Sequence, residues 1–175
     1  MGKKQVWAWL LIAALCGVPG AAFSSDLESI IAARDSNDRS RDNYRHPIET
    51  IRFFEIQPGM TVVETLPGGG WYTKILVPYI GENGRFFGAN YTNSLMERVA
   101  GKRWESWREW SEKWLDTFPV GAESYAMTPP KIGAFHISLA PKTLIGQVDR
   151  VLFIRSLHHL NRFDTQIQLL QPYIL

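Results

Sequence analysis

Three consecutive glycines, Gly68, Gly69 and Gly70, follow an apolar segment that contains one acid, Glu64. Glycine adopts backbone conformations that are closed to other residues, and it lets a ligand approach the main chain. The residues from Trp71 onward have helical spacing, and the start of a helix offers free N–H groups and a positive dipole end. Ligands of doubly wound sheets collect at such strand-to-helix turns. The pattern therefore predicts a small-molecule site, and the alternative is a purely structural glycine turn.

Two common nucleotide-binding patterns fit this turn poorly. A phosphate-binding P-loop requires Gly-Lys followed by Ser or Thr at the start of the helix, whereas Lys74 here follows Thr73. A dinucleotide fingerprint requires a third glycine at the position that Thr73 occupies. A ligand without a pyrophosphate group fits the turn better, because the helix start need not be devoted to phosphate.

Two distinctive strings and one generic string connect the chain to a known family. The distinctive ones are Arg-Asp-Asn-Tyr-Arg-His-Pro-Ile-Glu-Thr at 41–50 and Val-Val-Glu-Thr-Leu-Pro-Gly-Gly-Gly-Trp-Tyr-Thr at 62–73. The generic one is the segment from Asp149 that ends in Leu-His-His at 157–159. Through these strings, residues 27–160 resemble a secreted branch of the class I S-adenosylmethionine-dependent methyltransferase-like family.

The resemblance implies S-adenosylmethionine as the cofactor. It places Gly68 and Gly70 against the methionine part of the cofactor, includes Gly69 among the cofactor-binding residues, and has Glu64 order the turn. The second strand of such enzymes normally ends in an acid that takes the ribose hydroxyls, and the matching residue here is Asn90. Asparagine can accept one hydrogen bond and donate another, but it carries no charge. This departure motivates an alternative, a non-catalytic module that binds another small molecule on the same fold.

Methyl transfer depends largely on alignment of the methyl group with its acceptor, and a general base can assist. The candidate catalytic bases are His158 and His159, which follow the expected fourth strand, although both also suit a structural role. His46 is a weaker candidate, and we expect His136 to pack inside a strand. The four histidines have no acid at metal-ligand spacing, so we predict no metal site. The acceptor of the methyl group is not identified by the sequence.

Alternating strand and helix patterns predict an α/β protein. Strands are expected at 60–66, 85–91, 134–139 and 149–156, and helices at 27–34, from Pro47, at 71–79, 94–118 and 164–175. The first strand, helix and second strand form a βαβ unit with parallel strands. The expected fold is a Rossmann-like doubly wound sheet of the class I methyltransferase type, incomplete at the C-terminus because only four of its seven strands find residues. We therefore expect a truncated product or fragment.

Two further segments leave alternatives open. The polar stretch 34–43 reads as a solvated linker or as a flap over the site that uses side chains at positions 41, 44, 45 and 46. Tryptophans at 104, 107, 110 and 114 form a stripe on the expected helix, which predicts core packing. The alternative for the stripe is an aromatic wall beside a ligand. A loop is expected around Pro119, Gly121, Pro129 and Pro130.

The first residues resemble a secretory signal peptide. Lys3 and Lys4 precede an apolar run of about a dozen residues and small residues that favour cleavage after Ala22. The run is shorter than the roughly 20 residues of a spanning helix, so no permanent membrane span is expected. The predicted divisions are a signal peptide at 1–22, an N-terminal helical flap at 23–59 and a partial methyltransferase-like Rossmann domain at 60–175. The protein is therefore expected to be exported, to the periplasm or outside the cell.

Charge and cysteine content narrow the chemistry further. The whole chain of 175 residues has a formal charge of +2, which gives no argument for a nucleic-acid partner. Cleavage would leave about 153 residues, formally neutral, without Cys16, the single cysteine. A cysteine-free chain suits an oxidising compartment. It also excludes cysteine nucleophiles and thiolate metal sites.

Overall fold

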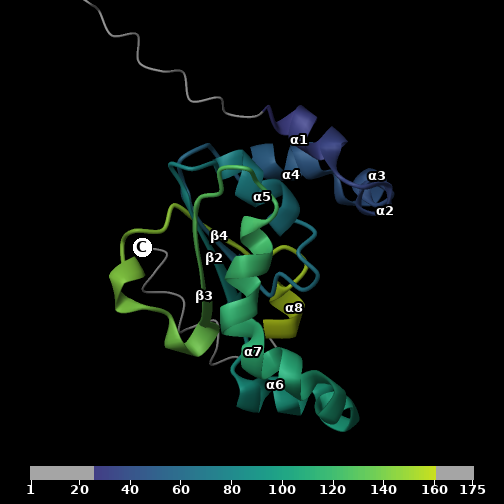
Figure 1. Cartoon of the computed structure of the whole chain (residues 1–175), viewed down its shortest axis with the longest axis vertical. Coiled ribbons are helices and arrows are strands. Elements are labelled where there is room, and N and C mark those ends of the chain that lie inside the picture. Colours follow the sequence, from purple (N-terminus) through teal and green to yellow (C-terminus); the bar gives the residue numbers. More distant parts are fainter. Residues whose placement is uncertain (1–25, 161–175) are drawn as a thin grey trace, which may run out of the picture.

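Four short strands form one parallel sheet in the computed structural model of this protein, which describes residues 26–160 (Figure 1). The predicted signal peptide and the helix expected at 164–175 lie outside the described residues. Each strand is an extended segment bounded by turns. The strands are β1 (Thr61–Thr65), β2 (Arg85–Asn90), β3 (Lys131–His136) and β4 (Arg150–Leu152).

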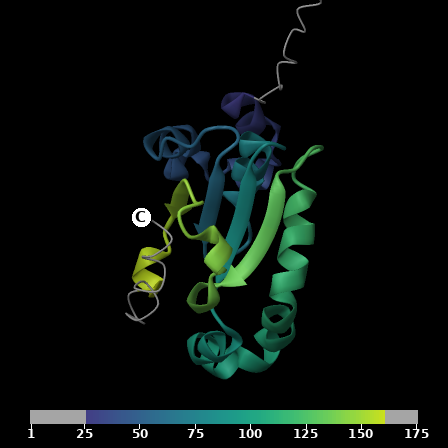
Figure 2. The ribbon, with the colours of Figure 1, turned by 90° about the vertical axis from the view of Figure 1, so that its left-hand side faces the viewer.

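The strand order in the sheet is β3-β2-β1-β4, and all neighbours are parallel (Figure 2). Central β1 pairs Val63 with Phe87 of β2 on one side and with Val151 of β4 on the other. This is the order of the first four strands of a Rossmann sheet, in which the direction of winding reverses between the first and fourth strands. The predicted α/β Rossmann-like fold is therefore confirmed.

Helices connect and cover the strands. Pro47 opens α4, because its fixed φ suits the first turn of a helix. No helix within residues 26–160 is long and apolar enough to cross a membrane. The helices are α1 (Leu27–Ala33), α2 (Ser36–Arg39), α3 (Asp42–Arg45), α4 (Pro47–Phe53), α5 (Thr73–Ile80), α6 (Asn93–Ala100), α7 (Trp104–Glu123) and α8 (Leu157–Leu160).

The two faces of the sheet bury separate apolar clusters, because successive side chains of a strand point to opposite sides. Val62, Phe86 and Leu152 pack on one face with α1, α4 and α5. Val63 and Ala89 pack on the other face with residues of α6 and of the segment after β3. Helix α7 reaches both clusters, since Phe118 joins the first and Trp107 the second.

The prediction of a single helix at 94–118 is wrong, because two helices occupy this region. The chain breaks at Gly101, whose φ of 53° ends α6, and a 3-10 turn (Gly101–Arg103) leads into α7. Helix α7 then runs through Pro119 and Gly121, where a loop was expected. Its tryptophans do not share one environment: Trp114 is buried, whereas Trp110 is 45% exposed. The third strand also begins three residues earlier than expected, and a 3-10 turn (Ile137–Leu139) follows it.

Gly88 lets α7 lie close against β2. A Cβ built on Gly88 would come within 2.3 Å of the Phe118 ring, so Gly88→Ala forces either the ring or the helix to move. We expect a loss of about 1–3 kcal/mol in the free energy of unfolding, the usual cost of overpacking. Gly121→Ala is the matched control, because its Cβ meets nothing within 4 Å and alanine favours a helix by up to about 1 kcal/mol. Denaturant unfolding measures both, and equal stability of the two variants would contradict this packing.

Candidate functional site

A pocket of about 450 Å³ opens where the chain reverses its winding, beside the C-terminal ends of β1 and β4. Ligands of open α/β sheets bind at this position. Three separate parts of the chain line the pocket: a helical segment at 37–45, the end of β1 with the turn and the start of α5 at 64–74, and the segment after β4 at 154–159. We call it the switch-point pocket.

The glycine turn forms one wall of this pocket with bare main chain. Leu66 leaves β1 with φ of 51°, and Gly68 and Gly70 have φ of 57° and 74°. Glycine adopts such values without a steric penalty. The Gly70 N–H donates to the Pro67 carbonyl at 2.9 Å and closes the turn. A Cβ at Gly69 would meet nothing within 4 Å, so a ligand can approach this backbone closely.

Glu64 is a buried acid in the same pocket. Only 4% of the residue is exposed, and its Oε2 accepts a hydrogen bond from Thr73 Oγ1 at 2.7 Å. Burial raises the pKa of Glu64 to about 7, and the Thr73 hydroxyl offsets part of that effect. The bond ties the C-terminal end of β1 to the first residue of α5. The carboxyl group can therefore hold either charge state near neutral pH.

A pair of hydroxyls joins β1 to the segment after β4. Thr65 Oγ1 donates to the Leu152 carbonyl at 2.8 Å, and it lies 3.0 Å from Ser156 Oγ. Because the single Thr65 proton is used by Leu152, the Ser156 hydroxyl is the donor to Thr65. Both side chains are buried. These bonds fix the position of the segment after β4 relative to the glycine turn.

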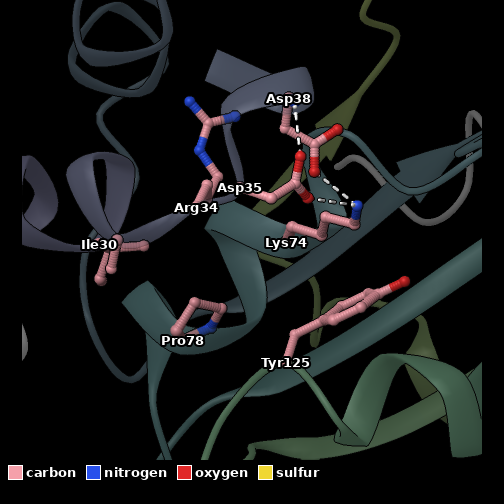
Figure 3. Close-up of a pocket in the computed structure, with 8 residues that line it drawn as sticks. Ile30, Arg34, Asp35, Asp38, Lys74, Pro78 and Tyr125 are labelled. Carbon is pink, nitrogen blue, oxygen red and sulfur yellow. Dashed lines mark hydrogen bonds and ion pairs between the residues drawn. The ribbon is translucent and has the colours of Figure 1, made fainter.

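Ion pairs hold α2 against α5. Asp35 caps α2 by accepting the Asp38 N–H at 2.9 Å. The Lys74 ammonium lies 2.5 Å from Asp38 and 3.7 Å from Asp35; Figure 3 shows the three side chains pointing toward one another. Lys74 and Asp38 line both the switch-point pocket and a neighbouring hollow of about 440 Å³ that also contains Tyr125. The ion pair therefore stands between these two hollows.

Trp71 provides the second attachment of this segment. Its Nε1 donates to the Asp38 carbonyl at 3.0 Å, and its ring lies 4.6 Å from the guanidinium carbons of both Arg34 and Arg45. Such contacts are cation–π interactions. The Tyr72 hydroxyl adds a bond to the Arg45 carbonyl at 3.1 Å.

Of the four side chains proposed for a flap, two line the pocket and two do not. Arg41 and Arg45 line the switch-point pocket, whereas Tyr44 is 82% exposed. His46 has φ of 44° where α3 passes into α4. The polar stretch is therefore not a plain linker in the structure, because it folds into two short helices that contribute to the pocket.

Another hollow, of about 250 Å³, lies on the other side of the glycine turn. We call it the tryptophan hollow. Gly70 and Thr73 line it together with Trp110 and Trp114 of α7. Gly68 and Gly69 border both the tryptophan hollow and the switch-point pocket. Two of the four tryptophans therefore stand beside the turn, in the position that the aromatic-wall alternative would require.

The structure brings some of the predicted site residues together and separates others. Glu64, Gly68, Gly69 and His159 line the switch-point pocket, and Gly70 lines the tryptophan hollow. Asn90 and His158 border neither. Asn90 is buried at the end of β2, and its Oδ1 accepts the Tyr91 N–H at 2.8 Å. The rings of His158 and His159 lie 3.9 Å apart.

Sequence reasoning missed several residues of the site. Arg155 and Ser156 line the pocket but had no motif to mark them, although they follow a strand end, where ligands bind in this fold. Lys74 stands out in the sequence only as a mismatch to the P-loop pattern. Its partners, Asp35 and Asp38, lie in a different helical segment, too far along the chain for a local pattern to connect them. No group of three metal-ligating side chains occurs among the described residues.

Known proteins match only a part of this chain. No protein-family profile matches the chain, and no curated protein sequence matches it. Among solved structures, the chain is similar to a SAM dependent methyltransferase from Aquifex aeolicus, with 27% sequence identity and a TM-score of 0.29. The similarity covers 42% of this chain and 40% of that enzyme.

Proposed function

We propose that this protein is methyltransferase-like and binds S-adenosylmethionine in the switch-point pocket. One observation carries the proposal: the bare glycine turn and the buried Glu64 carboxyl meet in a pocket at the reversal of a Rossmann-like sheet. A volume of about 450 Å³ is within the range of roughly 300–1,000 Å³ that small-molecule sites occupy. The two strings of the family resemblance supply the glycine turn and part of the helical segment.

Parts of the pocket lining offer surface to such a cofactor. The turn at Gly68 and Gly69 is open to a close-packed ligand, and Leu66, Trp71 and Ile154 add apolar surface. When bound, S-adenosylmethionine would supply an activated methyl group. Glu64 and the glycine turn would hold its methionine part. The chain's own task is then to align an acceptor and exclude water, and we propose His159, which lines the pocket, as the residue that takes a proton.

Gly69→Leu tests the location of the cofactor. Leucine at this position projects into open space without a strained φ, so the fold is retained while the turn is covered. We expect at least a tenfold loss of affinity for S-adenosylmethionine and its demethylated product, measured by titration calorimetry, because the side chain takes up ligand volume. Gly121→Leu is the matched control, because it also points into open space but borders only the tryptophan hollow.

The control separates the two hollows. Loss of binding in Gly121→Leu with retention in Gly69→Leu would move the ligand to the tryptophan side. Absence of binding by the wild-type protein, folded by circular dichroism, would refute the proposal itself.

A non-catalytic binding module is the second candidate, and Asn90 favours it. Asn90 stands where the family carries a ribose-binding acid, and its side-chain oxygen is used by the following backbone N–H. A module of this kind would keep the pocket and bind a different small molecule. Transfer of a labelled methyl group from S-adenosylmethionine to any component of a cell extract would exclude it. If transfer occurs, His159→Ala should slow it more than His158→Ala, because only His159 lines the pocket.

We also propose that the protein is exported. The support is the order of charges, apolar residues and small residues in positions 1–22. Fusion of these residues to a reporter that is active only outside the cytoplasm tests this. A reporter that stays inactive, while a known signal peptide activates it, would contradict export.

A further inference from the structure

Three arginine side chains border the switch-point pocket without an acidic partner among the residues that the structure describes. Arg41 and Arg45 come from the α3 segment, and Arg155 comes from the segment after β4. We propose that their guanidinium groups form an anion site, and that the substrate of this pocket is a small molecule with a carboxylate or phosphate group. The inference rests on the proposed function for the role of the pocket and specifies the class of its substrate.

The acids nearest in sequence are already paired with other cations. Asp42 lies 2.5 Å from Arg34. Lys74 lies 2.5 Å from Asp38 and 3.7 Å from Asp35. The two pocket arginines of this segment therefore form no ion pair with its three aspartates, although the charge of Asp38 still attracts Arg45 at longer range. Within residues 26–160, no ion pair involves either of them or the arginine after β4.

The acids inside the pocket do not neutralise it either. Four basic side chains line it against two acids, Asp38 and Glu64. Asp38 is held by Lys74, and Glu64 is hydrogen bonded to Thr73. Since burial raises the pKa of Glu64 to about 7, its carboxyl group is partly protonated near neutral pH. The pocket therefore has an excess of positive charge, which attracts anions.

Arg45 is placed to present its guanidinium plane to a ligand. The group lies 4.6 Å from the Trp71 ring and 6.0 Å from the Tyr72 ring, and stacking of this kind orients a planar guanidinium. Its pKa is lowered chiefly by burial, and the positive charges of Arg155 and Arg41 lower it further. Like charges that share a site repel one another, and an anion between them would relieve that repulsion.

Arg155 holds a backbone conformation that is unfavourable for arginine. Its φ is 57°, in the left-handed region, which glycine occupies freely and long side chains avoid. The next residue, Ser156, is fixed by its bond to Thr65. Strained residues of this kind cluster at ligand sites. A glycine would fit this position with less strain, but it would bring no guanidinium to the pocket.

The number of guanidiniums points to the substrate rather than to the cofactor alone. S-adenosylmethionine carries one carboxylate, and one guanidinium can bind a carboxylate through two parallel hydrogen bonds. The pocket has three guanidiniums that form no ion pair within the described part of the chain. The guanidiniums that the cofactor carboxylate does not use are therefore available to a second anionic molecule, the one to be methylated.

Titration of the full chain with inorganic phosphate and with benzoate, in the presence and absence of S-adenosylmethionine, tests the inference. We expect at least one of the two anions to bind, more weakly at high ionic strength. Arg45→Gln and Arg155→Gln should each weaken that binding by roughly tenfold or more. Arg108→Gln is the matched control, because Arg108 pairs with Glu105 on the exposed surface of α7. Binding of phosphate alone or benzoate alone assigns the anionic group.

Arg155→Gly separates binding from folding. The substitution removes the charge and also relieves the strained φ, so the melting temperature should be retained or raised while anion binding falls. Absence of binding of both anions to a protein that binds S-adenosylmethionine would overturn this inference alone. Binding of an anion without binding of S-adenosylmethionine would overturn the proposed cofactor and leave the anion site. Equal loss of cofactor and anion binding in the arginine variants would assign the guanidiniums to the cofactor and also overturn the inference.

Discussion

Glu64→Gln is expected to make the protein more stable at about pH 8 and to flatten the dependence of its stability on pH. In the folded protein the pKa of Glu64 is raised from 4.5 to about 7 by burial, so the folded state binds its proton more tightly than the unfolded state. The stability associated with that proton is present in full below pH 4.5 and is lost as the pH rises through about 7. The loss amounts to roughly 3 kcal/mol.

Glutamine keeps an oxygen that can accept the Thr73 hydroxyl but cannot ionise. Urea unfolding at several pH values between about 5 and 8 measures the difference between the two proteins. Glu105→Gln is the matched control, since Glu105 is exposed on α7. A wild-type stability that is unchanged or rises over this interval, with no gain in Glu64→Gln, would contradict the buried position of Glu64.

Trp71→Ala should have the largest effect on stability. The indole is 5% exposed, lies in the main apolar cluster, and is flanked by the guanidiniums of Arg34 and Arg45. Removal of a buried tryptophan side chain typically lowers the free energy of unfolding by about 3–5 kcal/mol. Trp71→Phe retains most of the ring surface and loses the Nε1 bond to the Asp38 carbonyl, so we expect a smaller decrease, of about 1 kcal/mol for that bond.

The same pair of variants tests the attachment of residues 36–45. This segment contains three arginines, at 39, 41 and 45, which are cleavage sites for trypsin. Trp71→Ala should be cut there faster than the wild-type protein under conditions in which both are folded, and Trp71→Phe should be cut at an intermediate rate. Equal rates for all three would mean that contacts other than those of Trp71, such as the Asp38–Lys74 ion pair and the bond from Tyr72 to the Arg45 carbonyl, hold the segment.

The strands that the sequence predicted best are those with clear boundaries. The ends of β1 and β2 follow from Pro58-Gly59, from the glycine turn and from the turn at 81–84, and their apolar residues are continuous. The break at Gly101 was hard to see in the sequence. The helical spacing of apolar residues before it continues with little change in the tryptophans after it. A glycine in a helical pattern can be tolerated or can end the helix, and only the packing of α6 against the sheet decides between them.

The site was predictable where local chemistry marks it and unpredictable where distant residues meet. The glycine turn is recognisable because a tight strand-to-helix turn needs glycine. The contact of Arg155 with the pocket depends on the pairing of β4 beside β1, which no local pattern encodes. Asn90 is a different case, since the resemblance assigned it to the cofactor while it is not among the residues that line the switch-point pocket.

The bond between Thr65 and Ser156 has a consequence for folding. It links positions 91 residues apart, and contacts of such long range form slowly because the intervening chain must be ordered first. The switch-point pocket is therefore complete only after the last described strand has docked. A ligand that recognises only the completed cavity would stabilise the folded state without assisting its earlier steps, so it should slow unfolding while leaving the rate of refolding nearly unchanged.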